Sequence, residues 1–296
     1  MRVLSSSEID AIVNHRELVE TLRRAYRSQT VVPSPVNLPI ERPETDGAAL
    51  IISPAWTNFK AQGHSKRGYI GCTISAALDG GTPSGAYLLL SGVNGLPIAI
   101  LDGARLAAWR HTAVHALACQ YLAREDCERL LILGSSPLLP LLVRALATVR
   151  DIRSVLVAGA EDETLAQLAA MPGTGKITFG STEDLQGAID GADMICCAEG
   201  GLALMAGANL PDGIHVSVLN PAEAPPEALF TDIRLFTADR QDRAAKGIAD
   251  LAADLGELTQ GQKAGRRFYG QKTLFAGGDI TGLTDLATAG HIFLRS

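Results

Sequence analysis

The chain has 296 residues, of which 47% are apolar and 20% charged, so we expect one large domain or two domains with room for a sizeable core. Its formal net charge of −6 gives no general attraction for nucleic acid or for an anionic membrane surface. The longest apolar stretches, Ala86–Leu101 and Leu130–Val143, are interrupted and fall short of the roughly 20 apolar residues of a membrane-spanning helix. No apolar segment of signal-peptide length stands at the N-terminus, which predicts a cytoplasmic protein.

The first part of the chain is predicted to combine helices with β-strands. Apolar spacing over Ser7–Arg27 indicates helical structure. The segment Val31–Gly85 is rich in Pro, Gly, Ser and Thr, with short apolar runs that are typical of strands and turns. Residues 86–91 and 96–101 flank an Asn-Gly pair and predict a hairpin. The Ala- and Leu-rich run Ala104–Arg124 predicts a long helix.

From Arg129 onwards, short apolar runs alternate with helical segments, which predicts a parallel sheet with both faces covered. The expected strands are Leu130–Leu133, Ser154–Val157, Lys176–Phe179, Asp193–Ala198, His215–Leu219 and Lys272–Phe275. The expected helices are Leu138–Val149, Glu161–Ala170, Thr182–Ile189, Asp239–Gly261 and Gly282–Phe293. The five cysteines form no C-x-x-C pair and lie mostly in apolar runs, as reduced core thiols do.

The turn after the first of these strands is a candidate phosphate-binding turn. Dinucleotide-binding folds place a G-x-G-x-x-G/A turn between a strand and a helix, where backbone N–H groups meet the pyrophosphate. Here only Gly134 of the three glycines is present, because Ser136 and Leu139 occupy the other two positions. Pro137 and Pro140 each remove an N–H donor. The turn therefore predicts either weakened dinucleotide binding or a strand-to-helix turn that binds nothing.

The end of the second strand leaves the choice between NAD and NADP open. An acidic residue there usually binds a ribose hydroxyl, and an arginine accommodates a 2′-phosphate. The only acidic residue near the end of this strand is Glu161, which lies beyond the usual position, and no arginine lies near the strand end.

The segment Leu90–Ala113 contains the run N-G-L-P-I-A-I-L-D-G-A-R-L-A-A-W-R-H-T-A. This run resembles, without a gap, the T-G-x-P-x-A-x-(L/M)-D-G-x-x-L-T-A-x-R-T-A-A stretch of the ornithine cyclodeaminase/μ-crystallin family. Shorter motifs follow in the family's order: Gly191–Asp193, Pro211–His215, Asp254–Leu258 with Gly261, Gly265-Arg266, Thr273–Phe275 and Asp285–Ala289.

The resemblance implies a fold and a set of partners. The expected fold class is α/β, with a Rossmann-type parallel-sheet domain, residues 126–267, inserted into a discontinuous α+β domain for substrate binding and dimerisation, residues 1–125 with 268–296. It also implies NAD or NADP as the cofactor, a small carboxylate-bearing ligand and a homodimer.

The family's substrate-binding and catalytic positions carry over only in part. Arg110 matches the arginine of the L-T-A-x-R motif, which implies that it binds the substrate carboxylate. At three other positions the family has a charged residue and this chain does not. Asn37 stands in place of an arginine, Ile70 in place of a lysine and Asn220 in place of an aspartate. The family's F-K-S-V-G stretch near the nicotinamide corresponds to Phe275–Asp279.

The remaining candidates complete the predicted site. His111 follows Arg110 and is the nearest titratable group for proton transfer. His111 and His115 have a spacing that zinc sites use, but no third ligand is evident and no metal is predicted. The residues predicted to bind the cofactor are Gly134, Ser135, Ser136, Leu138, Gly159, Cys197, Leu219 and Gly277.

Three functions fit these observations. The first is an NAD(P)-dependent oxidoreductase or cyclodeaminase-type enzyme that acts on a small amino, imino or keto acid held by Arg110. The second is a catalytically silent binding protein, a role that μ-crystallin serves within the family. The third is a regulatory dimer partner of an active relative. Family context favours the first, and the substituted lysine, aspartate and second glycine favour the other two.

Overall fold

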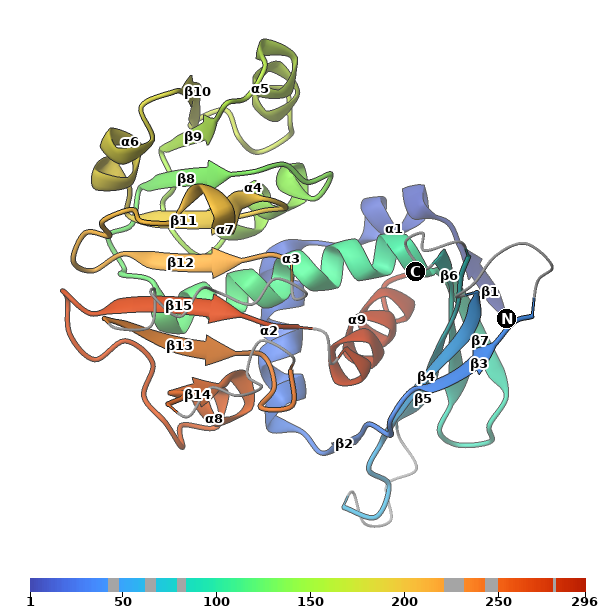
Figure 1. The fold of residues 1–296 in the computed structure, drawn as a ribbon. Helices are drawn as coiled ribbons and strands as arrows, with labels where there is room; N and C mark the ends of the chain where they lie inside the picture. The colour runs from blue at the N-terminus through green and yellow to red at the C-terminus, as the bar shows by residue number, and fades with distance from the viewer. Residues whose placement is uncertain (42–47, 62–67, 79–83, 221–231, 243–249, 279–280) are drawn as a thin grey trace. The chain divides into compact units, whose positions relative to one another are not determined.

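The computed structural model describes residues 1–41, 48–61, 68–78, 84–220, 232–242, 250–278 and 281–296. Contacts divide the chain into two compact units: Met1–His111 with Thr281–Ser296, and Thr112–Ile280. The first unit is therefore built from both ends of the chain, as Figure 1 shows by colour. Among the described residues, no helix has the length and apolar character needed to cross a membrane.

The first unit contains a largely antiparallel sheet. Its strands follow the order β1-β7-β6-β5-β4-β2, and β3 also pairs with β4. Their bounds are β1 (Arg2–Leu4), β2 (Thr30–Val31), β3 (Val36–Pro39), β4 (Ala49–Thr57), β5 (Tyr69–Ala77), β6 (Ser84–Ser91) and β7 (Pro97–Asp102). The β6–β7 hairpin confirms the predicted pair of strands around the Asn-Gly turn. The short β1, which the sequence did not predict, pairs in parallel with β7.

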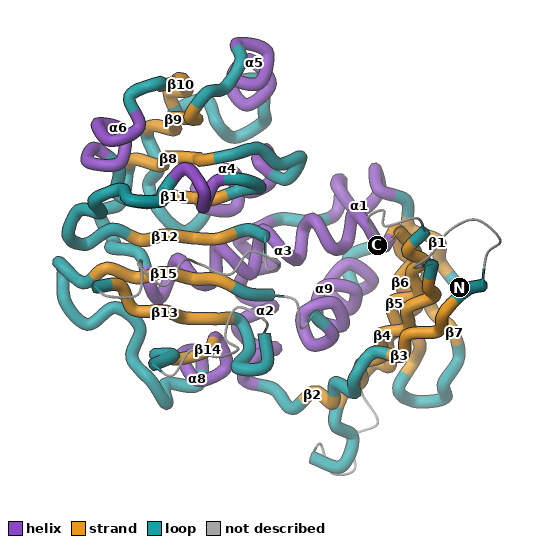
Figure 2. The backbone as a smooth tube through the Cα atoms, viewed as in Figure 1, coloured by secondary structure: helices purple, strands orange, loops and turns teal. Residues whose placement is uncertain are grey.

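Three helices belong to this unit: α1 (Ser6–Ile12), α2 (His15–Arg27) and α9 (Gly282–Phe293). The single helical region expected over Ser7–Arg27 is two helices, because the side chain of Asn14 accepts hydrogen bonds from the first N–H groups of α2 and starts a new helix there. Helix α9 packs against α2 and against β4 and β5, and Figure 2 shows it as a separate helix beside the sheet.

The second unit contains an all-parallel sheet of eight strands in the order β10-β9-β8-β11-β12-β15-β13-β14. Their bounds are β8 (Arg129–Leu133), β9 (Ser154–Ala158), β10 (Thr178–Thr182), β11 (Met194–Cys197), β12 (His215–Val218), β13 (Ile233–Thr237), β14 (Ala253–Asp254) and β15 (Lys272–Ala276). Chain order reverses between β8 and β11, as it does at the switch point of a doubly wound dinucleotide-binding fold. The predicted α/β fold class with a Rossmann-type parallel sheet is confirmed.

Hydrophobic cores lie on both faces of this sheet. Alternate residues of β8 belong to two different clusters, Leu130 and Ile132 to one, Leu131 and Leu133 to the other. Continuous apolar strands are what two covered faces require. The helices are α4 (Leu139–Ala147), α5 (Asp162–Ala169), α6 (Leu185–Gly191), α7 (Gly201–Leu204) and α8 (Leu255–Thr259), together with the C-terminal part of α3 (Gly103–Leu122).

The helix expected over Asp239–Gly261 is wrong for the described part of that segment. Ala253 and Asp254 form strand β14 beside β13, and the helix that follows covers only Leu255–Thr259. Asp254 ends the strand and starts the helix through a capping box: its side chain accepts the N–H of Glu257, whose side chain accepts the N–H of Asp254.

The boundary between the two units falls inside α3, between His111 and Thr112. At the other end the second unit runs to Ile280 and includes β15, which lies between β12 and β13 in the parallel sheet.

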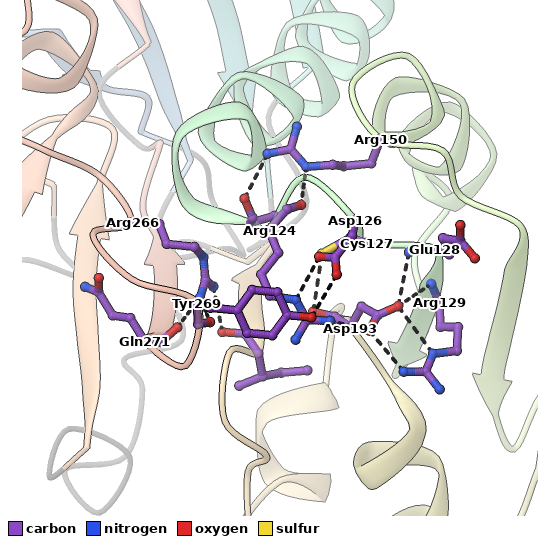
Figure 3. A network of polar contacts seen from close by, with 12 residues as sticks. Arg124, Asp126, Cys127, Glu128, Arg129, Arg150, Asp193, Arg266, Tyr269 and Gln271 are labelled. Carbon is purple, nitrogen blue, oxygen red and sulfur yellow. Dashed lines mark hydrogen bonds and ion pairs between the residues drawn. The ribbon is translucent and has the colours of Figure 1, made fainter.

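Two arginines hold the C-terminal end of α3 in the second unit (Figure 3). Arg150 donates to the carbonyl oxygens of Cys119 and Ala123, and Arg266 donates from Nε to the carbonyl oxygen of Leu122. Figure 3 shows the side chains of the two arginines. Cations at this end of a helix satisfy its last carbonyl groups and interact favourably with its dipole. The Gly265-Arg266 motif thus has a structural role in this chain.

Candidate functional site

The residues predicted to bind the cofactor gather at one edge of the parallel sheet. Five of them stand at the carboxyl ends of β8, β9, β11, β12 and β15, namely Gly134, Gly159, Cys197, Leu219 and Gly277. Ligands of open α/β sheets bind at this edge, beside the point where strand order reverses.

A cavity of about 400 Å³ opens at this edge beside β8, β9 and β11. It is lined by Gly134, Ser135, Leu139, Val157, Ala158, Gly159, Ala160, Glu161, Thr164, Glu199, Gly200 and Leu204. Three of the predicted residues, Gly134, Ser135 and Gly159, are therefore among its walls.

Gly134 is required by the packing of the protein itself. Its φ angle is +82°, and a Cβ atom on it would lie 2.2 Å from the carbonyl oxygen of Glu199. The N–H of Ser135 donates to that same oxygen at 3.4 Å, so the turn after β8 pairs with the segment after β11. Only glycine combines this backbone conformation with so close an approach.

Most N–H groups of the turn are already used within the protein. The N–H of Leu138 donates to Ser136 Oγ and that of Leu139 to the Ser136 carbonyl oxygen, each at 3.2 Å. Pro137 and Pro140 carry no N–H. Helix α4 begins without a side-chain cap at Leu138. The turn therefore offers a phosphate group far fewer donors than a complete glycine turn does.

Two exposed carboxylates line the cavity, and its described walls include no lysine or arginine. Glu161 precedes α5 as its N-cap residue and makes no capping bond with its side chain. Glu199, which the sequence analysis missed, follows β11 and is brought beside Gly134 by the pairing of β8 with β11. The Gly200-Gly201 pair directly after an apolar strand is the signal that marks this segment.

The other predicted cofactor residues are not among the walls of this cavity. The side chain of Cys197 is buried, with Sγ 3.2 Å from Met205 Sδ, and Leu219 belongs to a core cluster. Gly277 has a φ angle of +133°, and a Cβ on it would lie 2.4 Å from Asp242 Oδ2. Packing therefore requires a glycine at position 277, as it does at position 134.

Arg110 lies in the first unit, on α3, and its side chain is largely buried. Its Nε donates to Asp285 Oδ1 of α9 at 3.1 Å, which places the L-A-A-x-R motif against the D-L-A-T-A motif. The two terminal nitrogens of Arg110 have no partner among the described residues. An arginine oriented through Nε presents its other two nitrogens in the fork that matches a carboxylate.

Tyr87 of β6 lies near Asp285 of α9. The Tyr87 side chain is 1% exposed, and its hydroxyl has no hydrogen-bond partner among the described residues. Burial and the nearby Asp285 carboxylate raise the pKa of Tyr87 well above its usual value, so the hydroxyl stays protonated. A Cβ on Gly71 of β5 would meet both this hydroxyl and Leu286 of α9, so Gly71 faces α9 and its neighbour Ile70 faces the opposite side of the sheet.

The two histidines of α3 have separate surroundings. His115 is fully buried in the second unit, and its Nδ1 lies 2.7 Å from Ser217 Oγ. His111 is half-buried at the end of the first unit. The described residues contain no group of three or more His, Cys, Asp or Glu side chains that could hold a metal ion.

Comparison with known proteins places this geometry in context. The sequence profile of the ornithine cyclodeaminase/mu-crystallin family matches residues 3–293. A Δ1-pyrroline-2-carboxylate reductase of Colwellia psychrerythraea is 28% identical over 227 residues, which cover 74% of this chain and 70% of that protein.

Solved structures share the fold. A Δ1-pyrroline-2-carboxylate reductase of Thermococcus litoralis, in complex with NADH and L-proline, has a TM-score of 0.80 at 18% identity, over 100% of this chain and 97% of that one. An archaeal alanine dehydrogenase dimer with bound NAD has a TM-score of 0.79 at 18% identity, over 100% and 95% of the two chains. At these identities the likeness concerns the fold. Because the family profile spans nearly the whole sequence, the chain belongs to the ornithine cyclodeaminase/mu-crystallin family.

Proposed function

We propose that the chain is an NAD(H)-dependent oxidoreductase that acts on a small imino or amino acid. The observation that carries this proposal is the cavity at the switch point of the parallel sheet, with Gly134, Ser135, Gly159 and Glu161 in its walls. The family, and the Colwellia relative that is a Δ1-pyrroline-2-carboxylate reductase, support the same reaction class.

The cavity fits the ribose end of a dinucleotide better than its pyrophosphate. Glu161 follows β9, where an acidic side chain accepts hydrogen bonds from ribose hydroxyls. Two carboxylates without a cation among the described walls repel a 2′-phosphate, which favours NAD(H) over NADP(H). At the pyrophosphate end the N–H groups of Leu138 and Leu139 are occupied, so we expect weaker binding than a complete turn gives.

When bound, NADH supplies the hydride that reduces a C=N or C=O bond. Arg110 binds the substrate carboxylate through the two nitrogens that Asp285 leaves unused, and Asp285 fixes the orientation of the guanidinium. Burial and the charge of Asp285 keep the Tyr87 hydroxyl of β6 protonated, so it can act as a hydrogen-bond donor. His111 remains the proposed group for proton transfer.

Calorimetry with NADH and NADPH tests the cofactor, and NADH oxidation in the presence of Δ1-pyrroline-2-carboxylate tests the reaction. We expect NADH to bind and to be consumed, and Arg110→Ala to raise KM for the carboxylate substrate by at least about tenfold. Arg105→Ala, on the same helix, is the matched control and should leave KM within about twofold. If neither nucleotide binds at roughly millimolar concentration, the proposal is wrong.

A second candidate, a catalytically silent binding protein, is favoured by the uncharged residues at the family's reactive positions. Asn37, Ile70 and Asn220 stand where the resemblance implies an arginine, a lysine and an aspartate. Ile70 also lies on the face of the sheet turned away from α9 and Asp285. NADH binding without turnover on imino, amino or keto acids would favour this candidate, or a regulatory partner, over the enzyme.

We infer that the chain forms a homodimer through the face of the first sheet that α9 does not cover. Strand register places Val3, Val36, Leu38 and Ile74 on this face, with side chains 40–69% exposed. Exposed apolar patches of this kind are typical of subunit interfaces. Light scattering should show a dimer that Ile74→Lys dissociates and that Val93→Lys, in the exposed β6–β7 turn, leaves intact. A monomeric wild-type protein would disprove the inference.

A further inference from the structure

A second cavity, of about 390 Å³, lies within the first unit between α2, α9 and strands β2, β4 and β5. It is lined by Thr21, Arg24, Ala25, Ser28, Thr30, Thr57, Tyr69, Leu283, Leu286, Ala287, Gly290, His291, Leu294 and Arg295. Its volume is within the range of about 300–1,000 Å³ that is usual for small-molecule sites. It shares no lining residue with the cavity beside β8, β9 and β11, which we call the nucleotide cavity after the function proposed for it.

One side of this cavity is apolar and the other carries hydroxyl groups. Helix α9 and its C-cap residue contribute an apolar surface that includes Leu283, Leu286 and Leu294. The sheet strands contribute hydroxyl groups, among them those of Thr30 and Tyr69. Burial raises the pKa of the Tyr69 hydroxyl, which therefore stays neutral and able to donate a hydrogen bond. A ligand with an apolar body and a polar end matches these walls.

The charge of the lining is positive. Arg24 and Arg295 belong to it, and its described members include no aspartate or glutamate. Arg295 forms an ion pair with Glu17 at 2.8 Å. Arg24 donates only to the Glu20 carbonyl oxygen at 3.2 Å and to Thr21 Oγ1 at 3.5 Å, and among the described residues it has no carboxylate partner. Its positive charge is therefore available to a ligand.

His291 adds a neutral ring to the same wall. Its Nδ1 lies 3.0 Å from Thr21 Oγ1 and 3.3 Å from Arg295 Nη1, and its buried Nε2 has no hydrogen-bond partner among the described residues. Burial and the nearby Arg295 and Arg24 lower the pKa of His291 to about 4, and the ring is uncharged at neutral pH. The histidine thus does not compete with Arg24 for an anion.

We propose that this cavity binds a small amphipathic carboxylate, with its apolar body against α9 and its carboxylate at Arg24. The apolar wall disfavours an inorganic anion, and the unpaired guanidinium disfavours an amine or a neutral alcohol. The site belongs to the first unit alone and does not depend on the nucleotide cavity or on the reaction proposed above.

Calorimetric titration of the full chain with octanoate tests the proposal, with octanol and octylamine as neutral and cationic probes of the same length. Octanoate should bind, and Arg24→Gln should weaken it about tenfold to hundredfold, because a hydrogen bond to a charged group is lost. Arg16→Gln removes an exposed charge from the same helix outside the cavity and should change octanoate affinity by less than about twofold.

A second variant keeps the test independent of charge. Ala287→Phe fills the cavity and should abolish octanoate binding, while an unchanged far-UV circular dichroism spectrum reports that the protein is folded. The proposal is overturned if the wild-type protein does not bind octanoate at about 10 mM, if Arg24→Gln binds it as tightly as wild type, or if octanol binds equally well.

Discussion

Replacing Ser136 by glycine should tighten the binding of NADH. In the wild-type protein Ser136 Oγ accepts the N–H of Leu138 at 3.2 Å, so this donor is not available to a phosphate. Glycine at this position removes both the competing oxygen and the side chain that stands where a dinucleotide turn lets its ligand approach the backbone. The change therefore restores one donor and the space beside it.

The magnitude follows from one recovered hydrogen bond. A hydrogen bond to a charged group contributes about 1.5–3 kcal/mol, which corresponds to roughly a tenfold to hundredfold lower Kd. The N–H of Leu139 stays engaged with the Ser136 carbonyl oxygen, and Pro137 and Pro140 still lack donors. The affinity should therefore rise without reaching that of a complete glycine turn.

Calorimetry of NADH binding to three variants separates the two effects of the serine. Ser136→Ala frees the Leu138 N–H but keeps a Cβ, so it should give part of the gain. Ser136→Thr keeps the hydroxyl and should give none. If Ser136→Gly binds NADH no more tightly than the wild-type protein, the Leu138 N–H is not a phosphate donor and the reasoning fails.

Three further predictions concern stability, measured by urea unfolding. Tyr87→Phe removes an unpaired buried hydroxyl and should leave stability unchanged or raise it by about 1 kcal/mol; a clear loss would reveal a partner for that hydroxyl. Burial lowers the pKa of His215 to about 3, so the unfolded chain binds a proton that the folded one does not, and stability should fall as the pH drops from about 6.5 towards 3; a His215→Asn variant with the same slope would contradict this. Gly277→Ala, whose Cβ meets Asp242, should cost about 1–3 kcal/mol, more than Gly278→Ala, where the space is open.

The sequence predicted the central strands of the parallel sheet because burial on both faces demands continuous apolar runs. Leu130–Leu133 and Met194–Cys197 are such runs, and both are strands near the expected bounds. Strand β13 was missed because Arg234, whose side chain is exposed, interrupts its pattern. The place of β15 between β12 and β13 depends on pairing between distant segments, which no local pattern records.

The candidate site was predictable where a residue directly follows a strand. Gly134 and Gly159 end apolar runs, and both line the nucleotide cavity. Glu199 was missed, although it lines the same cavity, because its place depends on the register between β8 and β11 and on the bridge to Ser135. The partnership of Arg110 with Asp285 likewise joins positions 175 residues apart.

The position of Gly134 bears on how a degraded glycine fingerprint is interpreted. Because the Glu199 carbonyl oxygen leaves no room for a Cβ at this position, Gly134 would be needed whether or not the chain binds a dinucleotide. Its presence therefore does not discriminate between a cofactor site and a packed turn. A cofactor site is distinguished from a packed turn by positions where packing does not dictate the residue. These are Ser136, whose hydroxyl accepts the N–H of Leu138, and Glu161, whose side chain makes no capping bond to α5. The first weakens pyrophosphate binding and the second favours a ribose, so we expect affinity in this family member to come mainly from the nucleoside end of the cofactor.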